Sequence, residues 1–369
     1  MKVEFIEVFH TVGQDTIAHI EAGILTSWTS LIVNKNFDTW DDFQLNVVFS
    51  KENMKMFATD NLLVIDNEAF YITSIACPKI SNGITIKGRS VFGRISDRMI
   101  MDGNINYYNK KPSDIAEDMI NRQLISPSDP NRVITGLVKQ DSSTVLNGVT
   151  VQQGYGQLDD FVTNLMTTYD FGVREKVINR TSKFITQGYE FFTGNDVSNT
   201  VEISTDFQNL INPEFNDDIR DSKNFAMIAG EGDYPNRVIV TTGNTSGNIN
   251  RKELYIDARD LQKTTNNVTM SDKDYQAALI ARGQEKLQAA IKIYTLNGEL
   301  DVTSKLYELD SDFGLGSRVT IRSSDFNLST TSKIIKIAYT FDKDGSVKSG
   351  TPSHVDLTFD KDTLPVFSF

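Results

Sequence analysis

Short alternating runs of apolar and polar residues fill the first part of the chain. At the N-terminus, Phe5, Glu7 and Phe9 fall on one side of a predicted strand, and Ile6 and Val8 fall on the other. Similar runs follow, each rich in β-branched or aromatic residues and bounded by polar or glycine turns. The predicted strands cover residues 5–9, 31–33, 43–49, 62–65, 70–75 and 84–88. So many short strands in so short a segment predict a small barrel or sandwich.

The period of the pattern then changes from strand to helix. Residues 112–120 begin with a proline and an early acid, and the apolar side chains of Ile115, Met119 and Ile120 form one stripe. Residues 158–169 show the same helical spacing, and short strands are predicted between and after these helices. This middle part therefore reads as a mixed α/β segment.

β character returns near residue 206, interrupted by one further helix. Residues 271–290 are rich in Ala, Leu, Gln and Lys, with Ser271 as the candidate N-cap and Asp272 and Asp274 in the first turn. Further strands are predicted at residues 225–230, 237–240, 294–302, 318–321, 333–341 and 354–359. The order of the last strands repeats, weakly, the order of strands in the first domain.

These patterns predict a mixed β fold with α+β parts, in which two small β-barrel domains flank an inserted α/β domain. The expected domains are residues 1–98, 99–205 and 206–369, the last carrying an inserted helical segment around residues 257–290. A length of 369 residues allows two to four domains.

Composition narrows the class of protein. No apolar run is long enough to span a membrane, and the N-terminus lacks the apolar core of a signal peptide. We therefore expect a soluble protein that is made in a cytoplasm. The single cysteine, Cys77, excludes internal disulfides and is expected to be buried.

The net charge of −12, from 49 acidic and 37 basic residues, argues against a protein that grips nucleic acid. Acidic residues also keep a large β assembly soluble, and this second explanation carries equal weight.

No constellation of residues predicts catalysis. The three histidines, His10, His19 and His354, lie far apart in the sequence, and His19 with Glu21 makes at most half of a metal or acid–base pair. The motifs of zinc proteases, thiol redox proteins and serine hydrolases are missing from the sequence.

Acidic and glycine-rich segments of the sequence are also interpreted as turns or helix starts, and not as binding or catalytic sites. Residues 342–346 resemble the start of a calcium loop, but Ser353 stands where an EF-hand needs Glu, so a hairpin turn is favoured. Asp310, Asp312 and Gly314 are interpreted in the same way, with a cation at an assembly interface as the minor alternative. Two glycine pairs are too short to predict a nucleotide site, at residues 230–232 and 314–316. Three pairs of adjacent acids predict no hydrolase, at residues 41–42, 159–160 and 217–218. The sequence thus predicts no catalytic, cofactor-binding or metal-binding residue.

Residues 251–260, RKELYIDARD, resemble a signature of phage tail-associated (Tal-like) proteins, the hubs at the distal end of the tail tube of long-tailed phages and prophages. Further segments fit the same family in the same order, namely residues 29–49, 84–100, 223–240 and 271–287.

The resemblance implies a homotrimeric structural hub related to the central hubs of contractile tails. Such a hub closes or continues the tail channel, contacts the distal tail ring protein, the tape-measure protein and receptor-binding or fibre proteins, and lets DNA pass without specific binding. It belongs to the tail tip of the virion and needs no cofactor.

Two alternatives remain at this point, a tail-tip cell-wall hydrolase and a receptor-binding module. Hub relatives that cleave cell walls carry that activity in a C-terminal extension, and we expect none here. A sugar-binding groove would favour exposed tryptophans, whereas Trp28 and Trp40 lie within the first strand pattern and are expected to be structural.

Overall fold

The chain is described here from a computed structural model. The described residues are 1–11, 19–78, 82–181, 185–244, 247–265, 267–301, 304, 306–342, 351–360 and 366–367. Strands hold 45% of the chain and helices 19%, so the fold is mostly β, as predicted.

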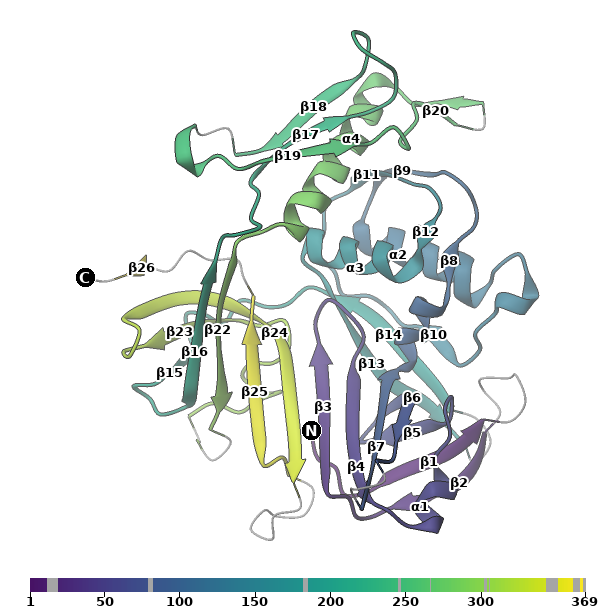
Figure 1. Ribbon diagram of the computed structural model, residues 1–369, viewed down its shortest axis with the longest axis vertical. Helices are drawn as coiled ribbons and strands as arrows, with labels where there is room; N and C mark the ends of the chain where they lie inside the picture. The colour runs from purple at the N-terminus through teal and green to yellow at the C-terminus, as the bar shows by residue number, and fades with distance from the viewer. Residues whose placement is uncertain are drawn as a thin grey trace.

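A 14-stranded sheet spans both ends of the chain (Figure 1). Its main path runs β16-β22-β25-β24-β3-β4-β7-β6-β5-β1-β2, and β23, β15 and β26 attach through β24. The N-terminal half contains β1 (Ile6–Thr11), β2 (His19–Leu25), β3 (Ser30–Asn36), β4 (Asp42–Val48), β5 (Leu62–Ile65), β6 (Glu68–Ala76) and β7 (Gly83–Ser90). The C-terminal half contains β15 (Glu202–Ser204), β16 (Leu210–Asp218), β22 (Ile293–Leu300), β23 (Arg318–Ser323), β24 (Leu328–Asp342), β25 (His354–Phe359) and β26 (Val366–Phe367).

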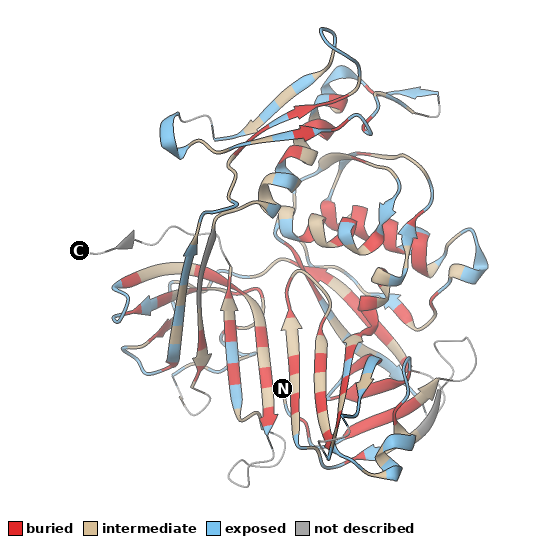
Figure 2. Ribbon diagram, in the orientation of Figure 1, coloured by how far each residue is buried: buried red, intermediate tan, exposed pale blue. Residues whose placement is uncertain are grey.

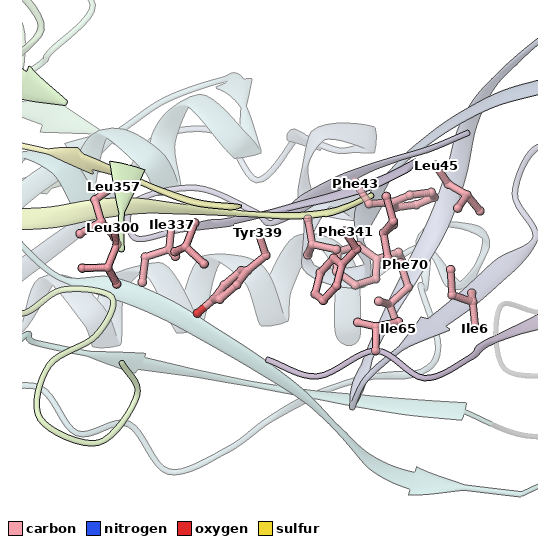
Figure 3. Close-up of a cluster of buried hydrophobic side chains, with 14 of the residues drawn as sticks. Ile6, Phe43, Leu45, Ile65, Phe70, Leu300, Ile337, Tyr339, Phe341 and Leu357 are labelled. Carbon is pink, nitrogen blue, oxygen red and sulfur yellow. The ribbon is translucent and has the colours of Figure 1, made fainter. Parts of the chain in front are cut away.

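The two halves join where β3 pairs antiparallel with β24, from Ser30 opposite Asp342 to Asn36 opposite Lys336. Side chains of both halves form one hydrophobic core beneath this seam. In Figure 3, Tyr339 and Phe341 of β24 lie between Phe43 and Phe70 on one side and Leu300 and Leu357 on the other. The seam therefore makes the two halves a single packed layer.

Strict alternation explains why these segments form strands with one buried face. Along β4, Phe43, Leu45 and Val47 are buried while the residues between them are partly exposed. The side chains of a strand point alternately to opposite faces, so one face of β4 enters the shared core. The red and tan bands along β3 and β4 in Figure 2 follow this period.

The expectation of two separate barrels needs correction. In the part of the chain that the structure describes, the strand path is open, and its two ends, β2 and β16, do not pair with each other. The sequence pattern was right about short strands in both terminal segments. It missed the β3–β24 pairing because a pairing between residues about three hundred positions apart leaves no local signal.

The middle segment packs around a second core. Helix α2 (Pro112–Ile120) lies against α3 (Leu158–Tyr169), and the hairpin of β13 (Gly172–Arg180) and β14 (Ile185–Phe192) runs back along the N-terminal half (Figure 1). The predicted apolar stripe of α2 is confirmed, because Ile115, Met119 and Ile120 are fully buried. The remaining elements here are β8 (Met99–Ile100), β9 (Ile105–Lys110), β10 (Leu137–Lys139), β11 (Val149–Gln153) and β12 (Gly156–Gln157), with 3-10 turns at Val91–Asp97 and Pro130–Arg132 and a π turn at Asn121–Ile125.

A smaller unit stands apart from the large sheet at the top of Figure 1. It packs α4 (Asp272–Ala289) against a three-stranded sheet of β17 (Phe225–Ala229), β18 (Ile239–Gly243) and β19 (Glu253–Asp257). The remaining short elements are α1 (Lys51–Met56), a 3-10 turn at Asn248–Asn250, β20 (Thr264–Thr265) and β21 (Val268–Thr269).

Candidate functional site

A cavity of about 680 Å³ lies where the two halves of the large sheet meet the β13–β14 hairpin. Its lining includes Lys35 of β3, residues 66–68, residues 173–176 of β13, and the loop at 310–315 before β23. Asp41, Glu68 and Glu175 gather on one wall, and we call these three residues the acidic cluster. One carboxylate oxygen from each lies within 4.8 Å of the others.

Three separate segments supply the acidic cluster. Asp41 immediately precedes β4, Glu68 is the first residue of β6, and Glu175 lies in β13. The hairpin reaches this wall because the amide of Val177 donates a hydrogen bond to the carbonyl of Asn67, at 2.8 Å. Tertiary pairing, not sequence proximity, thus builds the cluster.

Lys35 neutralises part of the cluster. Its Nζ lies 2.7 Å from Oδ2 of Asp41 and also contacts Oε2 of Glu68. The backbone amide of Asn36 donates a second bond to Asp41, to Oδ1 at 2.6 Å. The C-terminal end of β3 therefore fixes both oxygens of Asp41.

Glu175 is held by donors from two other elements. The amide of Phe92 and the side-chain amide of Gln187 donate to its Oε2, at 3.0 and 3.1 Å. Gln187 also accepts a bond from the amide of Ala69 at 3.1 Å. This glutamine thereby joins the hairpin to the residue that follows Glu68.

Burial and like charges dominate the electrostatics of the site. Burial, followed by the charge of Asp41, raises the pKa of Glu175 to about 7. Burial also raises the pKa of Glu68 well above its usual value, although the Lys35 ammonium opposes this shift. Burial lowers the pKa of Lys35, but the charges of Asp41 and Glu68 outweigh this effect and hold the pKa above its ordinary value.

The sequence did not single out this site. Asp41 was noted only as one of two adjacent acids, and Glu68 and Glu175 were not singled out. No spacing links them, because residues separated by whole strands have no fixed distance until the sheet forms. The prediction that the chain has no metal-binding, cofactor-binding or catalytic residue is untested by this geometry and stays a prediction.

The other acidic pairs lie where their sequence interpretation placed them. Asp42 is not part of the acidic cluster, and its Oδ1 accepts from the side-chain amide of Asn34 at 2.7 Å. Asp159 and Asp160 occupy the first turn of α3, where their charge is stabilised by the helix dipole. At the end of β16, Asp217 pairs with Lys292 at 2.8 Å and Asp218 with Arg220 at 2.5 Å.

Two of the histidines lie on paired strands, because Thr11, next to His10 in β1, is opposite His19 in β2. Nε2 of His10 lies 3.0 Å from the carbonyl oxygen of Met56. His354 has a partner that the sequence did not reveal, because its Nδ1 lies 2.6 Å from Oε1 of Glu299 on the neighbouring strand. This contact raises the pKa of His354 above its ordinary value. The side chains of His19 and Glu21 lie outside the described residues.

The predicted loops behave as turns. In the 310–314 segment the amide of Asp310 bonds to the carbonyl of Phe313, and Oδ2 of Asp312 accepts from the amide of Glu308, both at 2.8 Å. Gly230 and Gly232 follow β17 and open no helix, as expected. Residues 343–346 of the calcium-like segment lie outside the described part of the chain.

The expectation that Cys77 is buried is wrong, since its side chain is exposed. The end of β6 around Ser74 and Ala76 has already left the core, so the apolar neighbours of Cys77 do not cover it. Trp28 and Trp40 are structural as predicted, because Trp28 packs against the shared core and Trp40 against the second core.

The 251–260 signature has a structural role in the small unit. Its strand, β19, pairs parallel with β17. Asp257 accepts from Arg237 at 2.5 Å and from Arg259 at 2.6 Å, while Arg237 also donates to the carbonyl of Ala229 at 2.8 Å. The charged residues of the signature thus tie together the ends of the two strands.

Among the described helices, none combines the length and the apolar character that crossing a membrane demands. No curated protein matches the chain.

Solved structures of phage tail proteins share the fold over nearly the whole chain. The 43 kDa tail protein of prophage MuSo2 from Shewanella oneidensis aligns with a TM-score of 0.56 at 12% identity, covering 96% of this chain and 98% of that one. Prophage tail protein gp18 from Listeria monocytogenes EGD-e gives 0.54 at 13% identity, covering 97% and 95%. A tail protein from Neisseria meningitidis MC58 gives 0.53 at 12% identity, covering 96% of each chain.

At these identities the solved structures establish the fold alone, which this chain shares with the three phage tail proteins. The family itself is shown by a model of the siphovirus ReqiPepy6 Gp37-like proteins, which matches residues 18–349. The chain therefore belongs to the siphovirus ReqiPepy6 Gp37-like family and is a phage tail protein.

Proposed function

We propose that the chain is the subunit of a trimeric hub at the distal end of a siphophage tail tube. The observation that carries this proposal is the β3–β24 seam, which joins two β-rich halves into one layer with a shared core. A subunit with two such halves can present a similar surface twice. Three subunits around a threefold axis therefore present six copies of that surface. Closed cyclic symmetry is the usual form of such assemblies.

The open ends of the strand path suggest how copies meet. Each of the end strands, β2 and β16, is paired along one edge only in the described part of the chain. An unpaired edge presents free amide and carbonyl groups to a partner. We infer that the barrel-like closure predicted for each half is completed, if at all, between neighbouring subunits in the ring.

The two edges are not equivalent. Both end strands carry a register irregularity, between Ile211 and Glu214 in β16 and opposite Val8 and Phe9 in β2, and β16 also contains Pro213. A proline and a bulge both disfavour the addition of a further strand. Because Pro213 removes an amide donor from β16, we expect neighbouring subunits to contact β16 through side chains, and the β2 edge to be the better suited of the two for backbone pairing.

Within the virion, the proposed ring closes or continues the channel of the tail tube and anchors host-recognition or baseplate parts. Its expected neighbours are the distal tail ring protein, the tape-measure protein and receptor-binding or fibre proteins. DNA passes through the ring without specific binding. Membership of a phage tail family and the shared tail-protein fold support this location.

The mass of the purified chain in solution tests the proposal. Light scattering at micromolar concentration is expected to give about three times the 41.4 kDa chain mass. Electron microscopy of purified tails, averaged along the tail axis, should show a threefold ring at the distal end. Tails assembled without this chain serve as the control and should lack that density.

A monomer in solution together with tails that have no threefold density at the tip would contradict the hub. Density that this chain contributes along the tube, and not at the tip, would place the protein elsewhere in the tail.

A further inference from the structure

Two oxygens of the acidic cluster lack any hydrogen-bond partner. They are Oε1 of Glu68 and Oε1 of Glu175, and both atoms are shielded from solvent. Glu68 as a whole residue is only 3% exposed. A buried carboxylate oxygen without a partner is costly, and native proteins rarely leave one without a proton, a water or an ion.

The Ser90 hydroxyl lies beside Glu175 and lowers the pKa of this carboxyl, but the other donors near the cluster are directed at oxygens that already have partners. Lys35 contacts the other oxygen of Glu68, and Phe92 and Gln187 both donate to the other oxygen of Glu175. Three carboxylates and one ammonium leave two negative charges when all are ionised. A doubly positive ion that binds oxygen ligands would balance these two charges.

We propose that Asp41, Glu68 and Glu175 bind one divalent metal ion of the oxygen-preferring class, with Ca²⁺ as the best match. Two oxygens on one ion can be no farther apart than twice the metal–oxygen distance. That limit is about 4.8 Å for Ca²⁺ and about 4.2 Å for Mg²⁺. The three carboxylate oxygens lie within 4.8 Å of one another, so every pair fits the limit for Ca²⁺.

The surroundings suit an ion site. The cluster forms a wall of the 680 Å³ cavity, which gives an ion and its remaining water ligands a path to the cluster. Gln187 and the amides of Asn36 and Phe92 hold the ligand carboxylates in place. Metal sites generally need such outer hydrogen bonds to orient their ligands.

The bound ion connects parts of the chain that local structure leaves separate. Asp41 and Glu68 belong to the N-terminal half of the sheet, whereas Glu175 belongs to the β13–β14 hairpin. An ion that binds only the folded chain stabilises that chain in proportion to the logarithm of its concentration. We therefore expect Ca²⁺ to fasten the hairpin to the sheet.

The test uses the full-length protein after treatment with EDTA and dialysis. Calorimetric titration with CaCl₂ is expected to show binding of one ion per chain, and MgCl₂ in a separate titration is expected to bind more weakly. The midpoint of thermal unfolding should rise with added CaCl₂ and fall again when EDTA is added.

Single-atom replacements in the cluster locate the ion. Glu175→Gln and Glu68→Gln each remove one charged ligand and should weaken Ca²⁺ binding by about ten-fold or more. Asp66→Asn is the matched control, because Asp66 lines the same cavity outside the cluster and loses the same charge. This control should keep the affinity of the unaltered chain within about two-fold. Circular dichroism verifies that each variant is folded, and either glutamine variant alone suffices for the comparison.

Absence of saturable binding of Ca²⁺, Mg²⁺ and Mn²⁺ at millimolar concentration would overturn the proposal and leave a proton shared among the carboxylates as the explanation. Binding that Asp66→Asn weakens as strongly as both glutamine variants would overturn it as well, because the ion would then respond to the general charge of the cavity.

Discussion

Gly88 occupies one of the tightest positions in the N-terminal half of the sheet. It lies in β7 between β4 and β6. A Cβ atom on this residue would lie 2.2 Å from the carbonyl oxygen of Tyr71 and 2.4 Å from Cε1 of Phe43. The first of these atoms belongs to backbone and cannot rotate away, so only glycine fits here.

Replacing Gly88 with alanine is expected to lower the free energy of unfolding by about 2 kcal/mol or more, since overpacking of a core forces backbone shifts. Urea denaturation followed by fluorescence measures this loss. Gly83 in the same strand is the control, because its Cβ would meet nothing closer than the carbonyl oxygen of Val47 at 3.7 Å. Equal stabilities of Gly88→Ala and Gly83→Ala would show that the close approach is not present in solution.

At the same scale, the sequence identified residues by local chemistry and missed those that depend on distant neighbours. Ser271 as an N-cap and Trp28 as a structural residue were predicted correctly. The partner of His354 was missed, and Cys77 was misplaced, because both depend on what the folded sheet brings near or leaves uncovered.

Among the elements, helix α4 agrees closely with its prediction, as α2 and α3 do. The expected helix at 271–290 is observed as Asp272–Ala289, and Oγ of Ser271 accepts from the amide of Asp274 at 3.1 Å. The helix packs onto β17 and β18, and its Tyr275 and Leu279 are buried in the core of the small unit. The N-cap fixes where this helix begins.

Ser271→Ala removes that hydrogen bond and is expected to cost about 1 kcal/mol of stability. Chemical denaturation is the measurement, and Ser128→Ala at an exposed loop position is the control. A loss confined to Ser271→Ala supports the cap, whereas equal behaviour of the two variants contradicts it.

Strands were predicted less completely than helices. The final strands were recognised, but β24 extends over Leu328–Asp342 and thus starts earlier than the predicted 333–341 segment. Its first part pairs with β23 and its last part with β3. A strand whose two parts pair with different neighbours carries little sign of that division in its own pattern.

For the whole molecule, net charge leads to a prediction about DNA. The excess of 49 acidic over 37 basic residues repels a phosphate backbone. We expect the assembled chain to show no saturable binding to duplex DNA below about 10 µM at physiological salt, because the gain from counterion release needs clustered Lys and Arg. A fluorescence anisotropy titration with a labelled duplex checks this.

Tight binding that weakens steeply with salt would contradict the idea of a channel that lets DNA slide. A ring whose inner face is lined mainly by Lys and Arg would contradict it too. In that case the acidic residues would serve solubility at the outer surface.

The division into residues 1–98, 99–205 and 206–369 stays a prediction. The core shared by the first and last of these segments implies that a protease cut near residue 98 leaves the two products associated. The small unit has a separate core. We therefore expect a protease cut in its connections to the large sheet to separate the products more readily than a cut near residue 98.

The sequence by itself determined the mostly β character, the helices α2, α3 and α4, the lack of catalytic motifs, and the tail-protein family. These follow from patterns of a few residues, because alternation, helical spacing, caps and signature segments are local. Only the tertiary structure decided that the two halves share one sheet and one core. It alone placed Asp41, Glu68 and Glu175 together, since their proximity depends on the packing of β4, β6 and β13, which no local pattern encodes.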